Sequence, residues 1–143
     1  MPALRTIIFI LAIVACHGSS VFADSLSKHP FCIVTENGWT LGISYDGSAI
    51  LCRTGKAKER AVAVAGTFDY GKIVGSTALE CRRSKTAPTR LQYFYGQYDK
   101  PELHPLPESE SMLAVLNHAQ VIFQGCQNHK LLDLLRKHPI RIE

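Results

Sequence analysis

The sequence lacks the short motifs that mark most common enzyme sites. It contains no G-x-S-x-G nucleophile motif, no H-E-x-x-H zinc motif and no glycine-rich phosphate loop. It also has no C-x-x-C pair, which argues against a zinc site of the usual spacing, and no N-x-S/T acceptor for an N-glycan. These absences mean that neither a metal nor a cofactor is expected.

Apolar runs long enough to cross a bilayer are missing as well. The segment Thr6–Ala15 has ten apolar residues, about half of the roughly 20 that a membrane span needs. Arg5 precedes this segment, and Val21-Phe22-Ala23 follows it as a cleavage site before Asp24. We therefore predict that residues 1–23 are a signal peptide, that the protein is secreted to the extracellular space, and that it does not span the membrane.

A second processing site competes with this one. Ile13-Val14-Ala15-Cys16 is similar to a bacterial lipobox, in which Cys16 is lipidated and becomes the new N-terminus. The protein would then be periplasmic or lipid-anchored. The downstream site favours ordinary cleavage after Ala23.

Cleavage after Ala23 leaves 120 of the 143 residues, which fits a single domain over residues 24–143. Loss of Arg5 lowers the formal net charge from +4 to +3, which permits attraction to nucleic acid or anionic surfaces without requiring either. An even number of cysteines in an exported chain predicts two disulfide bonds. The cysteines concerned are Cys32, Cys52, Cys81 and Cys126.

The clearest local pattern predicts a three-stranded meander. The β-rich runs Phe31–Glu36, Trp39–Tyr45 and Ser48–Arg53 are separated by Asn37-Gly38 and Asp46-Gly47, which suit two-residue type I′ turns. Loops of two residues would give one nearly apolar face. That face would hold Cys32, Val34, Leu41, Ile43, Ile50 and Cys52, with Trp39 and Tyr45 at its ends.

The same register limits the disulfide pairing. Cys32 and Cys52 would lie two strand spacings apart, roughly 9–10 Å, whereas the Cα atoms of a disulfide lie within about 7 Å. Each should therefore pair with a later cysteine. The two alternatives are Cys32–Cys81 with Cys52–Cys126, or Cys32–Cys126 with Cys52–Cys81.

The rest of the chain mixes helical and extended patterns. We expect an exposed charged connector (54–60), a strand (61–65), a helix with Asp69 as N-cap (69–83), a loop (84–89), a strand (91–95), an irregular proline-rich loop (99–111), a short helix (112–118), a strand (120–123) and a helix capped by Asn128 (129–137). The predicted class is α+β, with an antiparallel sheet that begins with the meander, one or two short helices and two disulfides.

Histidines next to prolines are the candidates for acid–base chemistry. His29, His104 and His138 each precede a proline, which holds them in extended backbone and is typical of surface loops. Glu102 could pair with His104 as base and acid. The sequence thus offers His104, His138 and Glu102 as weak catalytic candidates and no metal ligand set.

An aromatic stretch, RLQYFYGQY at 90–98, is the candidate binding surface. On a strand, Leu91, Tyr93 and Tyr95 share one face. Exposed tyrosines could stack on bases or sugars, or anchor a protein partner; the alternative is core packing with the hydroxyls at the rim. The candidate binding residues are Arg90, Tyr93, Tyr95 and Tyr98.

One family resemblance covers residues 66–126. GTFDYGKIVGSTALEC, with Phe68, Ile73 and Cys81, resembles the helix of the small fungal guanyl-specific ribonucleases and of the ribonuclease-like effectors of plant-pathogenic fungi. The order continues with an aromatic strand (93–98), LHPLP (103–107) and AQVIFQGC (119–126). Where that family has its histidine, glutamate and arginine, this chain has Tyr95, His104 and Gln120, and only His138 could serve as the final histidine. The resemblance implies a scaffold without ribonuclease chemistry, as in the effectors.

The leading hypothesis is therefore a secreted, non-enzymatic interaction protein that resembles a pathogen effector and binds a protein of a host. The second is a secreted ribonuclease or small hydrolase that uses His104 and His138. The third, tied to the lipobox, is a bacterial periplasmic or lipidated inhibitor. A protein is the expected partner, with nucleic acid as the weaker choice.

Overall fold

The described part of the chain contains a six-stranded antiparallel sheet and three helices. The computed structural model describes residues 30–83, 89–96 and 102–141; the predicted signal peptide, His29 and Tyr98 lie outside these ranges. The elements are β1 (Phe31–Thr35), β2 (Trp39–Ile43), β3 (Ala49–Arg53), β4 (Lys56–Ala63), α3 (Tyr70–Arg83), β5 (Leu91–Tyr95), β6 (His104–Leu106), α4 (Glu110–Phe123) and α5 (His129–Lys137). The strand order is β4-β3-β2-β1-β5-β6. The predicted α+β class with an antiparallel sheet is confirmed.

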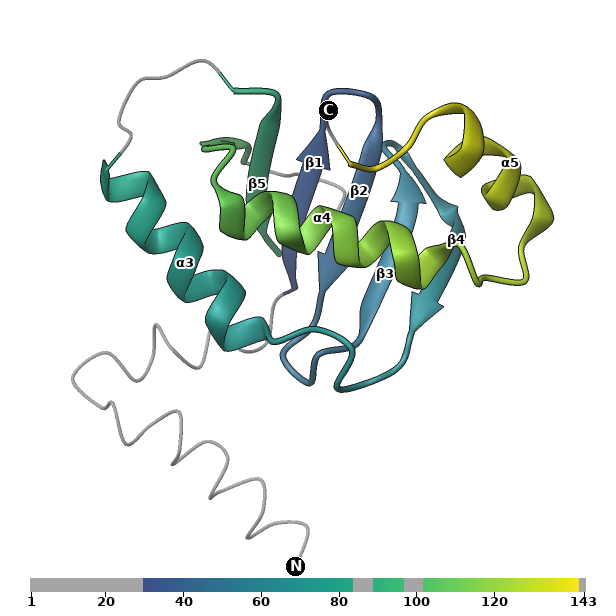
Figure 1. Ribbon diagram of the computed structural model, residues 1–143, viewed down its shortest axis with the longest axis horizontal. Coiled ribbons are helices and arrows are strands. Elements are labelled where there is room, and N and C mark those ends of the chain that lie inside the picture. Colours follow the sequence, from purple (N-terminus) through teal and green to yellow (C-terminus); the bar gives the residue numbers. More distant parts are fainter. Residues whose placement is uncertain (1–29, 84–88, 97–101, 142–143) are drawn as a thin grey trace, which may run out of the picture.

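The helices cover one face of this sheet. Figure 1 shows α4 running across the front of the sheet, α3 on the side of β5, and α5 on the side of β4. One continuous core lies between the sheet and the helices. Two helices have 14 residues each, so the helical content exceeds the one or two short helices that we expected.

The meander is present, but its register differs from the expected one by a residue at each turn. Phe31 pairs with Ile43, and Ile43 pairs with Ala49, so both loops have three residues. Gly38 and Gly47 have φ values of 92° and 82°, whereas no other residue type in the described part of the chain has positive φ. A type I turn followed by a left-handed glycine closes such three-residue loops, and type I′ turns are not used.

Side chains alternate along a strand, so a shift of one residue changes which side chains of β1 and β3 share a face with a given side chain of β2. The helix-covered face therefore differs from the predicted apolar face. It carries Phe31, Ile33, Trp39, Leu41, Ile43, Ala49, Leu51, Ala61, Ala63 and Leu91. Cys32, Val34, Ile50 and Cys52 lie on the opposite face, beside Thr40 and Gly42.

The prediction of two disulfides is wrong for this structure. No disulfide bond joins any two of the four cysteines at 32, 52, 81 and 126. Cys32 and Cys52 lie on the sheet face turned away from the helices, whereas Cys81 belongs to α3 and Cys126 packs against the core on the helix side. Both expected pairings would have to pass through the sheet.

Helix α4 replaces a predicted short helix and strand. Ser109 is its N-cap, and the Ser109 hydroxyl accepts a hydrogen bond of 3.2 Å from the backbone N–H of Met112. Met112, Leu116, Ala119 and Phe123 are buried at helical spacing. Because this stripe continues without a break, residues 120–123 are helical and not extended.

Two further segments are strands that the sequence did not predict. Most of the expected connector at 54–60 belongs to β4, an edge strand whose charged side chains tolerate exposure. The expected strand at 61–65 is its second half, up to Ala63. Strand β6 lies in the proline-rich loop and pairs Leu106 with Leu91. Pro105 is accepted there because β6 is the other edge of the sheet.

The helices α3 and α5 form where the sequence predicts them. The Asp69 carboxylate accepts from the Lys72 N–H at 3.0 Å, and the Asn128 side chain accepts from the Leu131 N–H at 3.1 Å. The segment after α5 is fastened to β2, since Trp39 Nε1 donates to the His138 carbonyl at 2.6 Å. The bonds at Asp69 and Asn128 confirm both predicted caps.

Candidate functional site

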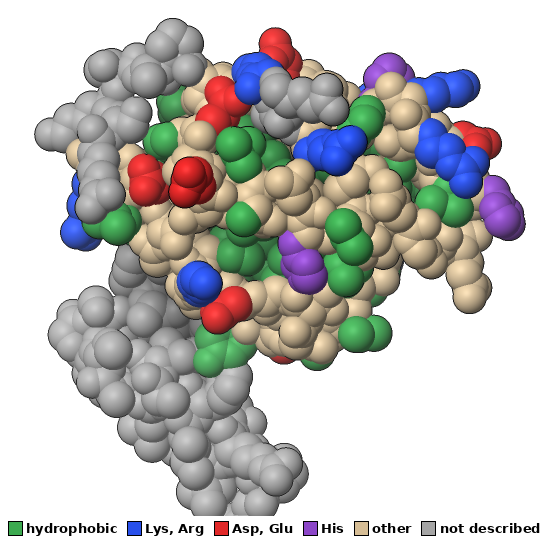
Figure 2. Space-filling model, viewed as in Figure 1, with side chains coloured by type: hydrophobic (Ala, Val, Ile, Leu, Met, Phe, Trp, Pro, Cys, Tyr) green, Lys and Arg blue, Asp and Glu red, His purple; other side chains and the backbone are tan. Residues whose placement is uncertain are grey.

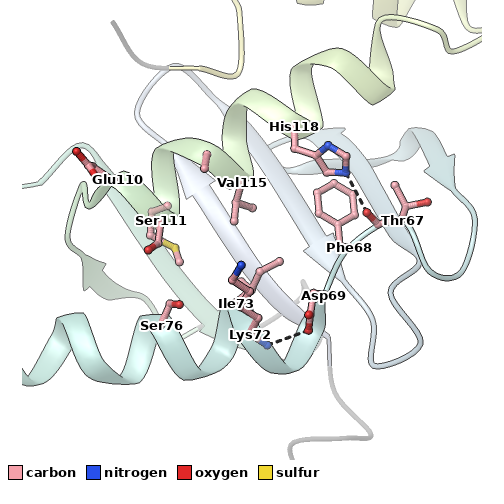
Figure 3. Close-up of a pocket in the computed structure, with 12 residues that line it drawn as sticks. Thr67, Phe68, Asp69, Lys72, Ile73, Ser76, Glu110, Ser111, Val115 and His118 are labelled. Carbon is pink, nitrogen blue, oxygen red and sulfur yellow. Dashed lines mark hydrogen bonds between the residues drawn. The ribbon is translucent and has the colours of Figure 1, made fainter.

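A groove lies between α3 and α4 on the helix-covered face. Its volume is about 540 Å³, and it is open to solvent. The apolar side chains of Phe68, Ile73, Met112 and Val115 line it, together with polar groups from both helices, as Figure 3 shows. In the space-filling view (Figure 2), apolar patches lie over α4 on this face, with most of the charged side chains around them. A hollow of this size and lining is typical of ligand and peptide sites.

The local structure fixes how the two helices meet. The Thr77 hydroxyl donates to the carbonyl of Ile73 at 2.8 Å and lies 3.7 Å from the Met112 sulfur, so α3 and α4 are in contact there. Toward the start of α3, the loop that carries Thr67 and Phe68 lies between the helices. The groove is the space between this loop and the contact at Thr77.

His118 fastens that loop to α4. Its Nε2 lies 2.9 Å from the Thr67 carbonyl oxygen, and its ring meets the Phe68 ring edge-on, with 5.0 Å between the centroids. Because a carbonyl only accepts, Nε2 carries the proton in this bond. His118 therefore holds the wall of the groove, while its side chain stays exposed to solvent.

Charged groups stand at the rim of the groove. Lys72 projects from α3 toward α4, and Glu110 lies at the start of α4 (Figure 3). Neither forms an ion pair with another residue in the described part of the chain. The Glu110 carboxylate is favoured by the dipole of α4. The dipole of α3 does not stabilise the charge of Lys72 in the same way. Lys72 lies in the first turn of α3, where the helix dipole disfavours a cation.

The structure does not bring the predicted catalytic histidines together. His104 lies on β6, exposed, with its ring 5.3 Å from that of Tyr93. His138 ends α5, and its backbone carbonyl accepts from Trp39 on β2. Strands β6 and β2 are three places apart in the sheet, about 14 Å. Glu102 is exposed, two residues before His104, and no hydrogen bond or ion pair within the described residues orients its side chain.

The tyrosines of β5 take part in packing on the helix side of the sheet. Tyr95 lies 5.3 Å from the Phe31 ring and Tyr93 lies 5.7 Å from it, measured between centroids. Burial raises the pKa of both phenols; near Tyr95, the neighbouring Tyr70 adds to this effect. Both tyrosines are half-buried, which agrees with the core-packing alternative for this stretch.

Arg90, the remaining binding candidate within the described residues, forms an ion pair with Glu108. Its guanidinium donates to the Glu108 carboxylate through Nε at 2.9 Å and through Nη2 at 2.5 Å. Arg90 thus joins the start of β5 to the segment before α4. Tyr98 lies outside the described residues.

The groove residues were not among the sequence candidates. The sequence predicts a short helix that ends at His118, whereas the structure has His118 on the exposed side of the longer helix α4. The signal was present, because Ser111, Ala114, Val115 and His118 follow at helical spacing. Their pairing with α3 depends on the tertiary packing of two separate helices, which local patterns do not reveal.

The described residues offer neither a cluster of metal ligands nor a helix suited to a membrane. Within residues 30–83, 89–96 and 102–141, no group of three or more His, Cys, Asp or Glu side chains could hold a metal ion. Within the same ranges, no helix has both the length and the apolar character that crossing a membrane requires.

Comparison of the chain with protein-family models, with curated proteins and with solved structures gave no match.

Proposed function

We propose that this protein is an exported, non-enzymatic interaction protein whose groove between α3 and α4 binds a protein partner. The observation that carries the proposal is the groove itself, an open hollow of about 540 Å³ with an apolar lining. Exposed apolar surface of this kind is a cost in water unless a ligand or partner covers it. A pathogen effector that binds a host protein fits this arrangement.

Exposed apolar side chains beside the groove support a protein partner. Val64, Leu79 and Val121 have exposed fractions of 78%, 47% and 68%. Val64 is joined to Thr67 by a hydrogen bond, and Leu79 and Val121 follow Ser76 and His118 by three positions, which puts them on neighbouring parts of the same helix faces. The apolar area therefore extends beyond the groove, as a protein interface requires.

The arrangement of the histidines favours binding over hydrolysis. A hydrolase that used His104 and His138 would need both side chains at one substrate, whereas they belong to β6 and to the end of α5. Incubation of the purified protein with RNA tests the alternative. Cleavage that is lost on His104→Ala or His138→Ala would support a ribonuclease and contradict our proposal.

Export is part of the proposal and has its own test. The pattern at residues 1–23 favours a mature N-terminus at Asp24. Mass spectrometry of the exported protein should find this terminus. A lipidated N-terminus at Cys16 would instead assign the protein to a bacterial membrane and favour a periplasmic or lipidated inhibitor.

A groove-filling variant tests the binding site. Ala114 is exposed and lines the groove, so Ala114→Trp should fill it, whereas Ala78 is exposed on α3 outside the groove lining. Peptides selected on the purified protein from a random 16-residue display library should bind the wild type and Ala78→Trp equally, and Ala114→Trp at least tenfold more weakly. Equal binding to all three proteins would place the interaction elsewhere and overturn the proposal.

A further inference from the structure

We infer that the occupant of the groove is an amphipathic α-helix of the partner, with an acidic side chain placed against Lys72. This inference rests on the proposed function and specifies the chemistry of the partner. It follows from three features of the groove: the walls, the small residues at the rim, and the charge of Lys72.

The walls select a helix over an extended strand. Both sides of the groove are helices, whose backbone N–H and C=O groups bond within the helix. An extended peptide in the groove would find no row of backbone partners for its own polar groups, and burying them without partners is unfavourable. A helix satisfies its backbone internally and presents an apolar stripe, which is the usual way to occupy such a groove.

Small residues at the rim permit a close approach. Ser76 on α3 and Ser111 and Ala114 on α4 line the groove. These short side chains stand on both walls, so a third helix can pack closely between α3 and α4.

The charge of Lys72 identifies one contact of that helix. Its side chain extends from α3 toward α4 (Figure 3), over a lining that includes Ile73 and Val115. Within the described residues Lys72 has no ion-pair partner. An incoming apolar surface would remove water from this ammonium group, and an opposite charge on the occupant offsets that loss. A carboxylate at the flank of the apolar stripe fits this requirement beside Lys72. Asp69 and Glu110 also line the groove, but the first caps α3 and the dipole of α4 favours the second, so neither calls for a cation on the occupant.

Designed peptides test this inference directly. The probe is a 16-residue amphipathic helix with leucines at positions i, i+3, i+4 and i+7 and one glutamate beside the stripe; matched peptides carry Gln or Lys in its place. We expect the Glu peptide to bind at least threefold more tightly than the Gln peptide and tenfold more tightly than the Lys peptide. Lys72→Glu should reverse the order of the Glu and Lys peptides.

Controls separate this inference from the proposed function. Lys58→Glu changes an exposed cation on β4, outside the groove, and should leave all affinities unchanged. A peptide of the same composition with two central prolines should bind at least tenfold more weakly. If Ala114→Trp abolishes binding but Lys72→Glu leaves the order unchanged, the groove is the site and the acidic contact is wrong. If the proline peptide binds as well as the helix, the occupant is not helical.

Discussion

At the scale of single residues, most polar side chains near the core have a structural task. Thr77 and His118 join α3, α4 and the loop before α3, and Gln120 Oε1 accepts from the backbone N–H of Ile140 at 2.8 Å. None of the buried side-chain N or O atoms in the described residues lacks a hydrogen-bond partner. Lys72 differs from these residues because it stands over an apolar hollow without an ion pair, and it therefore carries our inference about the partner.

Tyr70 provides a test of the core at this scale. Burial raises its pKa to about 12, above the ordinary value of 10.0. Because the folded state holds this proton more tightly than the unfolded state, the phenol contributes its full stabilisation below about pH 10. That contribution falls as the pH rises to about 12. Tyr70→Phe should therefore weaken the loss of stability between pH 10 and 12, as measured by urea unfolding at several pH values. Titration of the Tyr70 phenol near pH 10 would show that it is not buried.

At the scale of elements, the sequence predicts those with local signals. Helix α5 has Asn128 as N-cap, a leucine stripe and cations in its last turn, so its limits are as predicted. The meander was predicted from its β-rich runs, but the residue pairing depends on loop geometry, which Asn37-Gly38 and Asp46-Gly47 leave open between two and three residues. The groove was not predicted, because it arises only when α3 and α4 pack on the same sheet.

The substitution Gly47→Ala tests the loop geometry that sets the register between β2 and β3. Its φ is 82°, and an added Cβ would lie 2.4 Å from the Phe68 carbonyl oxygen and 3.0 Å from the Gly66 nitrogen. Gly55 has a similar φ of 81° with no atom within 4 Å of such a Cβ, so it is the matched control. Gly55→Ala should cost about 1–2 kcal/mol from backbone conformation alone. Gly47→Ala should lower the free energy of unfolding by at least about 1 kcal/mol more. Equal losses for the two variants would contradict this contact.

At the scale of the whole molecule, the sheet and the helices are held by a shared apolar core and not by covalent links between cysteines. The core includes residues from β1 to β4, α3, α4 and α5. A domain of roughly 100 residues can bury enough surface to fold without disulfides. The even cysteine count predicted two disulfides. A count carries no information on the sheet face that each cysteine occupies, so it could not show that the expected partners lie on opposite faces.

Thiol chemistry tests this account of the whole fold. We expect that a reducing agent leaves the urea midpoint of the purified protein unchanged. The partly exposed thiols of Cys81 and Cys126 should react with a thiol reagent in the folded state. Cys52 should react slowly, because it is 1% exposed and burial raises the pKa of its thiol. A large drop in stability on reduction would indicate a disulfide that this structure lacks.

The most direct test of the central claim is a titration of the isotope-labelled protein with the amphipathic Glu peptide, followed by NMR. Our account predicts that the backbone signals that shift most belong to residues of the groove, namely Lys72, Ile73, Ser76, Ala114, Val115 and His118. The signals of β4 and of α5 should change little, and Ala114→Trp should suppress the shifts. Shifts centred on β4, or on the histidines at 104 and 138, would contradict the assignment of the groove as the binding site.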